Sequence, residues 1–194
     1  MEITSTAIKA LRDQTGISVM QCKKALEEAN GDMDKALIIL KQKRKEAADK
    51  KSDRELGAGA IGVYVHNTGE VAAMVLLASE TDFVSKNEEF TALAREIAMH
   101  IAATNPMYIS REEVNEEAIN KAKEVFAEDI KDKPAEMQEK IMEGKLSAYF
   151  QEQILLEQPF IKNPDTTIGE MVNGAIQKFG ENVSIVEFKR ISVK

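Results

Sequence analysis

Hydrophobic residues recur every three or four positions through the first forty residues of the chain, which is the spacing of amphipathic helices. The apolar positions fall into three groups, Ile3 to Leu11, Met20 to Leu26 and Met33 to Leu40. Ser18 and Gln21 form a capping box at the start of the second group, and Asp32 follows a turn as an N-cap of the third. The pattern predicts a three-helix head over residues 1–42.

The pattern changes in residues 43–56, where charged residues dominate and large apolar residues are nearly absent. Acidic residues interrupt the basic ones throughout this segment, which argues against a nucleic-acid tail. We interpret residues 43–56 as a charged linker or a solvent-exposed extension of the third helix.

Strand-like patterns begin after this segment. Residues 59–66 alternate, residues 70–79 are apolar on both faces, and Asn67-Thr68-Gly69 between them is typical of a hairpin turn. Residues 182–193 alternate again, with an irregularity expected at Val186-Glu187.

Four segments with helical spacing lie between these strands. Ser85 with Glu88, and Ser110 with Glu113, have the spacing of capping boxes and predict two of the helix starts. The remainder of the chain, residues 57–194, is therefore predicted to be an α+β core. It would hold an antiparallel sheet of about three strands with helices packed on it.

Composition narrows the function classes. The net charge of −7 argues against a nucleic-acid binder, and no apolar run is long enough to span a membrane. The first five residues lack the features of a secretory signal and Cys22 is the single cysteine, so we expect a cytoplasmic protein. Residues 1–54 carry 12 lysines and arginines against 9 acidic residues, whereas the remainder carries 14 against 24. This asymmetry indicates two modules with different surfaces.

The motifs of enzyme chemistry are missing from the sequence. Two histidines and one cysteine do not build a typical zinc site, and there is no phosphate-binding P-loop or nucleophile elbow. Residues 57–62 match G-x-G-x-x-G, but they precede a strand instead of following one, so we interpret these glycines as strand-entry flexibility. We expect no catalytic residues, no metal, no cofactor and no enzyme activity.

The most informative residues are Thr81-Asp82-Phe83-Val84, between the second strand and the helix that follows it. An aspartate beside a phenylalanine at such a junction presents a charge and an aromatic ring together, which suits insertion into another protein. The alternatives for Asp82 and Phe83 are a helix-start carboxylate and a core ring. If Ser85 is the N-cap, the residue that would pair with Val84 in a hydrophobic staple is Glu89, which is not apolar.

Five motifs together resemble the bacterial elongation factor Ts family in its short form, over essentially the whole chain. They are Leu11-Arg12-Asp13-Gln14-Thr15-Gly16, Met20-Gln21-Cys22-Lys23-Lys24-Ala25-Leu26, Asn30-Gly31-Asp32, Glu80-Thr81-Asp82-Phe83-Val84 and the pair Phe160 with Phe188-Lys189-Arg190. The chain departs from the family at Ile17-Ser18-Val19, Ser85 and its last four residues.

The resemblance implies a ubiquitin-associated-like head, a linker, and a core that serves dimerisation and exchange. It implies a guanine nucleotide exchange factor for elongation factor Tu in translation elongation, acting as a homodimer. Phe83 would wedge between two helices of the partner and Asp82 would disturb its Mg²⁺ site, with Thr81 and Val84 in the same region. Arg12, Met20, Lys23 and His100 would contact the partner. The alternatives are plain surface charges for Arg12 and Lys23, a core side chain for Met20 and a partly buried helix position for His100.

The residues alone leave two other functions open. A protein-binding adaptor could use the head alone, but it leaves the Asp82-Phe83 pair unexplained. A small hydrolase would need a site that the sequence does not offer.

Overall fold

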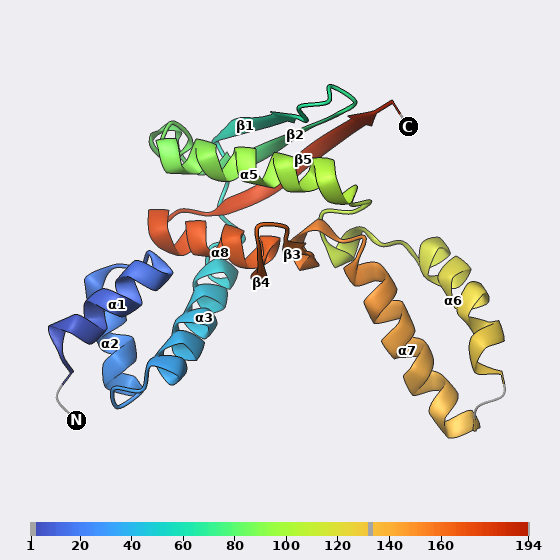
Figure 1. Cartoon of the computed structure of the whole chain (residues 1–194), viewed down its shortest axis with the longest axis horizontal. Helices are drawn as coiled ribbons and strands as arrows, with labels where there is room; N and C mark the ends of the chain where they lie inside the picture. Colours follow the sequence, from blue (N-terminus) through green and yellow to red (C-terminus); the bar gives the residue numbers. More distant parts are fainter. Residues whose placement is uncertain (1–2, 132–133, 194) are drawn as a thin grey trace. The chain divides into compact units, whose positions relative to one another are not determined.

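The computed structural model describes residues 3–131 and 134–193 of the chain. Within these residues the structure is mixed helix and sheet, which confirms the predicted α+β class (Figure 1). Contacts divide the chain into two compact units. The first comprises Met1–Ala60, Leu77–Thr91 and Glu170–Ser184, and the second comprises Ile61–Leu76, Ala92–Gly169 and Ile185–Lys194.

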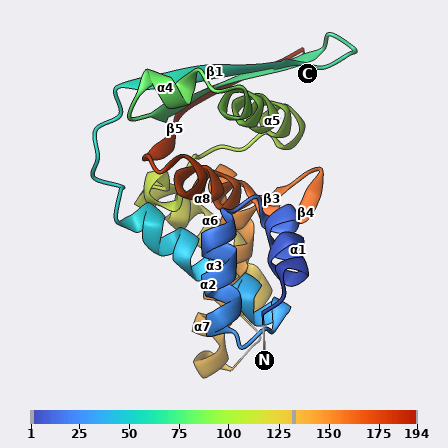
Figure 2. The ribbon, with the colours of Figure 1, turned by 90° about the vertical axis from the view of Figure 1, so that its left-hand side faces the viewer.

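The three head helices are present as α1 (Ser5–Thr15), α2 (Val19–Glu28) and α3 (Met33–Asp49). The predicted caps form, because Ser18 accepts from the backbone N–H of Gln21 and Asp32 accepts from that of Lys35. The three helices lie side by side (Figure 2). They pack around a small core whose fully buried members include Leu11, Cys22, Ala25, Leu26, Ala36 and Leu40. α3 continues through Asp49, so the first half of the charged segment 43–56 is helical.

Two further helices belong wholly or mostly to the first unit. α4 (Asp82–Ser85) directly follows β2 (Val71–Ser79), and most of α8 (Ile168–Phe179) belongs to the same unit. The Phe90 ring meets the Phe179 ring edge-on, with the ring centroids 5.9 Å apart.

The second unit contains most of the predicted sheet. β1 (Ala58–Val65), β2 and β5 (Val183–Ser192) form an antiparallel sheet in the order β1-β2-β5. The alternation of burial along β5 changes phase at Val186 and Glu187, which are both exposed, at the place where the sequence predicted an irregularity. α5 (Glu88–Thr104) lies along one face of this sheet (Figures 1 and 2).

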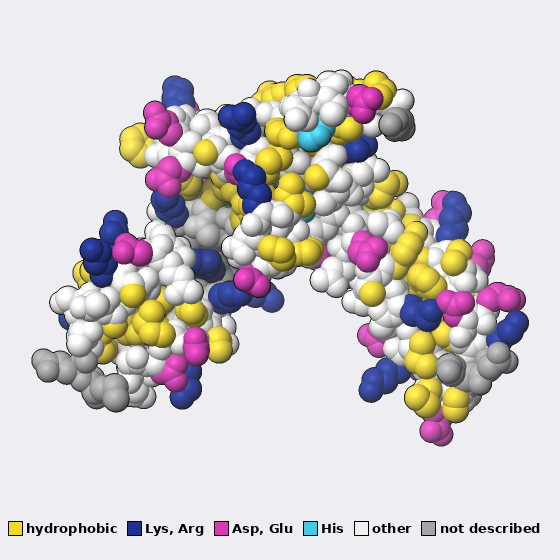
Figure 3. All heavy atoms as spheres, in the orientation of Figure 1, with side chains coloured by type: hydrophobic (Ala, Val, Ile, Leu, Met, Phe, Trp, Pro, Cys, Tyr) yellow, Lys and Arg dark blue, Asp and Glu magenta, His cyan; other side chains and the backbone are white. Residues whose placement is uncertain are grey.

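A helical hairpin and a small second sheet complete this unit. α6 (Glu116–Ile130) and α7 (Ala135–Gln151) pack against each other, and hydrophobic side chains gather along them between charged ones (Figure 3). β3 (Pro159–Phe160) pairs antiparallel with β4 (Asn163–Thr167), a sheet that the sequence analysis did not predict. Two 3₁₀ turns, Arg111–Glu113 and Leu155–Glu157, connect these elements.

Two predicted helix starts are wrong. Ser85 is not an N-cap, because it is buried inside α4, where its hydroxyl donates to the carbonyl of Asp82; α5 begins at Glu88, after Asn87, whose side chain accepts from Glu89 N–H. Ser110 precedes a 3₁₀ turn, and the N-cap of α6 is Asn115. In both places a second polar residue a few positions later provides the cap.

Candidate protein-interaction site

α4 presents one aromatic side chain to solvent and buries its neighbour. Phe83 is 85% exposed, whereas Val84 is 3% exposed and Ser85 is 7% exposed. Because adjacent helical residues point in different directions, the buried pair holds α4 against the protein while the Phe83 ring projects outward. An apolar ring exposed to this extent has no packing role in its own chain and is available to another protein.

Asp82 lies beside this ring and is also exposed. Its carboxylate pairs with Lys86 Nζ at 2.6 Å, one helical turn away, and the two side chains are 71% and 76% exposed. The hydrogen bond and the charge of Lys86 lower the pKa of Asp82, so the carboxylate is ionised at neutral pH. An exposed pair of this kind is weak, so Asp82 can exchange Lys86 for another partner at little cost.

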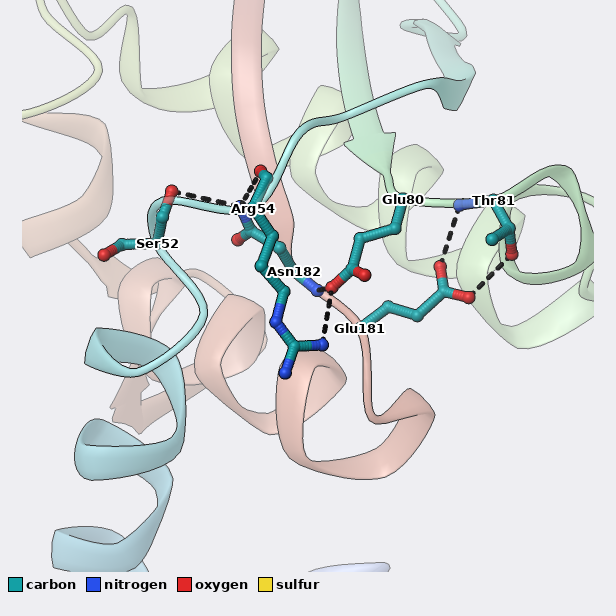
Figure 4. Close-up of polar contacts among 6 residues, drawn as sticks. All are labelled: Ser52, Arg54, Glu80, Thr81, Glu181 and Asn182. Carbon is teal, nitrogen blue, oxygen red and sulfur yellow. Dashed lines mark hydrogen bonds and ion pairs between the residues drawn. The ribbon is translucent and has the colours of Figure 1, made fainter.

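Thr81 and Glu80, just before α4, connect α4 to the turn between α8 and β5 (Figure 4). Glu181 accepts hydrogen bonds from the backbone N–H and the hydroxyl of Thr81, at 3.0 and 2.6 Å. Glu80 accepts one from the backbone N–H of Asn182 at 2.5 Å, and this bond, followed by the charge of Arg54, lowers the pKa of Glu80. Sequence reasoning missed Glu181 and Asn182 because they are a hundred residues from their partners and show no local pattern.

The head carries its three candidate residues on its surface. Arg12 lies on α1, and Met20 and Lys23 lie on α2; all three are exposed, Met20 by 68%. Arg12 and Lys23 each make a long ion pair with a residue of their own helix, at 3.8 Å. Exposed ion pairs of this kind contribute little to stability, so both cations can leave them to bind a partner.

Arg44 joins the head to α8 within the first unit. From α3, its Nε donates to Gln177 Oε1 at 3.2 Å and its Nη2 donates to the carbonyl of Thr15 at 3.1 Å. Lys41, also on α3, pairs with Glu170 at 3.2 Å. These side-chain contacts connect α3 both to the end of α1 and to α8. The head is therefore held in the same unit as α4.

His100 is placed differently from what the resemblance implied. It is 0% exposed, so it offers no surface for direct contact with another protein. Its Nε2 lies 2.8 Å from Gln158 Oε1, and the backbone N–H of Ile161 points to its Nδ1 at 3.4 Å. If Nδ1 accepts from Ile161, then Nε2 carries the proton and the ring is neutral. The physical reason for the difference is that His100 lies on the core face of α5.

The burial of His100 makes stability depend on pH. Desolvation lowers the pKa of His100 below its ordinary 6.5, so below that pH the unfolded chain binds a proton that the folded chain excludes. Stability is therefore full above 6.5 and falls as the pH decreases, by at most about 1.4 kcal/mol per pH unit. Urea unfolding between about pH 7.5 and about pH 5 measures this fall, which His100→Gln should make smaller. Equal pH profiles for the two proteins would contradict the assignment.

A metal cluster and a membrane-spanning helix are both absent from the described residues. Residues 3–131 and 134–193 contain no group of three or more His, Cys, Asp or Glu that could hold a metal ion. No helix in this part of the chain is both long and apolar enough to cross a membrane. What the arrangement can do is present an aromatic ring and a carboxylate on a fixed support.

Comparisons with known proteins find similar sequences over most or all of the chain. The family model described as "Elongation factor TS" matches residues 23–194. A protein from Thermodesulfovibrio yellowstonii named "Elongation factor Ts" is 47% identical over 194 residues, covering 100% of this chain and 97% of the relative. Proteins of the same name from Carboxydothermus hydrogenoformans and Fervidobacterium nodosum are 48% and 45% identical over 193 and 195 residues. The match covers 98% of this chain and 89% of the Carboxydothermus protein. It covers 100% of this chain and 99% of the Fervidobacterium protein.

Proposed function

The chain belongs to the elongation factor Ts family, and we propose that it is a guanine nucleotide exchange factor for elongation factor Tu. The observation that carries the proposal is the 85% exposure of Phe83 on a short helix beside an ionised Asp82. A side chain kept for packing would be buried, and a random surface position is seldom an aromatic residue.

The proposed mechanism acts through contact between the two proteins, without covalent chemistry. The Phe83 ring enters a gap between two helices of the partner's nucleotide-binding domain. Asp82 leaves Lys86 and disturbs the groups around the partner's Mg²⁺ ion near the β-phosphate, so that GDP loses part of its binding energy. Thr81 and Val84 hold the pair in place, since Thr81 bonds to Glu181 and Val84 is buried.

The magnitudes require a second contact. An exchange factor weakens nucleotide binding by the same factor as nucleotide weakens its own binding. A 10⁴-fold effect needs roughly 5.5 kcal/mol of differential binding, whereas burying one phenylalanine yields about 1.5–3 kcal/mol. We therefore propose that Arg12, Met20 and Lys23 of the head dock on the partner. The contacts of Arg44 with Gln177 and Thr15 support this, because they tie the head to the unit that carries α4.

His100 has an indirect part in this proposal. It supports α5 from inside through Gln158 and does not touch the partner from its buried position. The division into a head (1–42), a charged segment (43–56) and a core (57–194), and a cytoplasmic location without bound nucleic acid or cofactor, belong to the same proposal.

A binding comparison separates exchange from simple adaptor function. An exchange factor must bind nucleotide-free elongation factor Tu much more tightly than the GDP-loaded form, because binding and nucleotide release are coupled. Titration of the chain against both forms should give dissociation constants that differ by orders of magnitude. Equal constants would leave only an adaptor.

We also propose that two copies of the chain associate through the open face of the sheet. Exposed apolar residues gather there from all three strands: Ile61, Val63 and Val65 on β1, Met74 on β2, and Val186 and Ile191 on β5. A row of apolar side chains on one face of a sheet is typical of an interface. The open face of the sheet belongs to the core (57–194), and the resemblance assigned dimerisation to this core.

A charge in the middle of this face should prevent association. Val63 is 50% exposed, so Val63→Lys leaves the folded monomer intact but places a charge in the interface, and we expect dimerisation at least about 100-fold weaker. The matched control is Val125→Lys on α6, where valine is 70% exposed. Sedimentation equilibrium measures both, and a Val63→Lys chain that associates like the unaltered one would refute this interface.

A further inference from the structure

The α4 helix is too short to hold its own position. It has four residues, and its N-cap residue Thr81 makes no side-chain capping bond to the helix. Isolated helices become stable only at three or more turns, so the geometry of Asp82 and Phe83 must be fixed by groups outside α4. Burial of Val84 fixes the inner side of the helix, but the start of the helix needs a second support.

Glu181 is the residue that reaches the start of α4. Both of its carboxylate oxygens bind Thr81, one through the backbone N–H and one through the hydroxyl (Figure 4). The carbonyl of Thr81 in turn accepts from the hydroxyl of Ser79, which is 0% exposed, at 3.0 Å. The N–H, hydroxyl and carbonyl of Thr81 are therefore all occupied within the chain, two residues before Phe83.

The position of Glu181 is fixed by its neighbours. Gly180 has a φ of 75°, which lets the chain turn sharply out of α8. Asn182 follows and is 6% exposed; its side-chain amide donates to the carbonyls of Ser52 and Arg54, at 3.3 and 3.0 Å (Figure 4). The turn thus sits on the segment that follows α3.

A second contact runs in parallel from this turn. The Glu80 carboxylate accepts from the Asn182 backbone N–H and from Arg54 Nη1, the latter at 3.3 Å. Residues 80 and 81 are consecutive, as are residues 181 and 182, so two adjacent pairs join the end of β2 to the same turn. Hydrogen bonds to a charged acceptor are the stronger class in proteins.

We propose that Glu181 is a positioning residue for nucleotide exchange: by holding Thr81, it presents Asp82 and Phe83 in the geometry that the partner binds. This inference rests on the proposed exchange function. A segment ordered before binding loses less entropy when it binds, so the benefit of Glu181 falls on the insertion step and not on the docking of the head.

The test replaces the carboxylate by an amide of the same shape. Glu181→Gln removes the acceptor for one of the two Thr81 donors, so we expect the maximal rate of GDP release from elongation factor Tu to fall about tenfold. The concentration of chain that gives half the maximal rate should change less than about threefold, because the head still docks. Thr81→Val loses the hydroxyl donor to Glu181 and should resemble Glu181→Gln.

The control removes the same charge elsewhere. Glu117 on α6 pairs with Lys121 one turn away in an exposed ion pair, so Glu117→Gln should exchange at the unaltered rate. A tenfold loss in this control as well would assign the effect to net charge and refute the positioning role. Glu181→Gln with an unchanged maximal rate would refute it equally.

Hydrogen exchange of the free chain tests the contact without the partner. The amides of Thr81 to Ser85 should exchange at least about tenfold faster in Glu181→Gln, while those of α5 keep their protection. Unchanged protection at Thr81 would overturn the proposal even if exchange activity were confirmed. If the unaltered chain does not accelerate GDP release, the proposed function fails, and this measurement still decides whether Glu181 orders α4.

Discussion

Replacing Phe83 by alanine is expected to lower the maximal rate of GDP release from elongation factor Tu about 10- to 100-fold. The ring is 85% exposed in the free chain, so its removal costs the fold almost nothing. Burial of a phenylalanine in a partner contributes about 1.5–3 kcal/mol, and each 1.4 kcal/mol changes a rate or an equilibrium tenfold. Binding to the partner should remain measurable because the head still docks.

Stopped-flow release of a fluorescent GDP measures this effect, with the chain varied to saturation. Val125→Ala on α6 is the matched control, since Val125 is an apolar side chain with 70% exposure. It should release GDP at the unaltered rate. An unchanged rate in Phe83→Ala would remove the ring from the mechanism, and equal losses in both variants would indicate a non-specific effect of surface truncation.

Gly62→Ala should destabilise the chain by about 3 kcal/mol. A Cβ atom on Gly62 would lie 2.2 Å from the carbonyl carbon and oxygen of Ala94 and 2.7 Å from the backbone nitrogen of Arg95. These are backbone atoms in α5, so they cannot move aside as a side-chain end would. Gly62 is therefore required because α5 approaches β1 backbone to backbone.

Gly144→Ala provides the control for this prediction. Gly144 lies in α7, and a Cβ there would meet nothing within 4 Å. Alanine in a helix interior is favoured over glycine, so this variant should gain about 0.5–1 kcal/mol. Urea unfolding of both variants gives the two changes, and a Gly62→Ala chain as stable as the unaltered one would contradict the close packing.

Most secondary structure was predictable because its signals are local. Ser18 and Asp32 act as N-caps where the sequence placed them, and Gly16 adopts the left-handed conformation that ends α1. The first and last strands followed from alternation over eight or more residues, and the second strand followed from a continuous apolar run. Errors arose where two polar residues compete for one cap: Asn87 and Asn115 provide caps that Ser85 and Ser110 were expected to form.

The site was only partly predictable for the opposite reason. The position of Thr81 to Val84 at the end of a strand is a local property, and the sequence indicated it. The exposure of Phe83, the burial of His100 and the contacts of Glu181 with Thr81 depend on side chains from distant parts of the chain. No periodicity records that Gln158 meets His100, although the flanking Ala98 and Ile101 mark that face of α5 as buried.

The proposal that the chain releases nucleotide by protein contact is tested most directly with catalytic amounts of the chain. Elongation factor Tu loaded with fluorescent GDP is mixed with excess unlabelled GDP and about one hundredth of an equivalent of the chain, and the loss of fluorescence is followed. We expect complete release at a rate proportional to the amount of chain, since one molecule serves many partners in turn. Release no faster than without the chain would contradict this proposal. A fast phase that releases only as much GDP as there is chain, about one molecule per molecule, would contradict it as well.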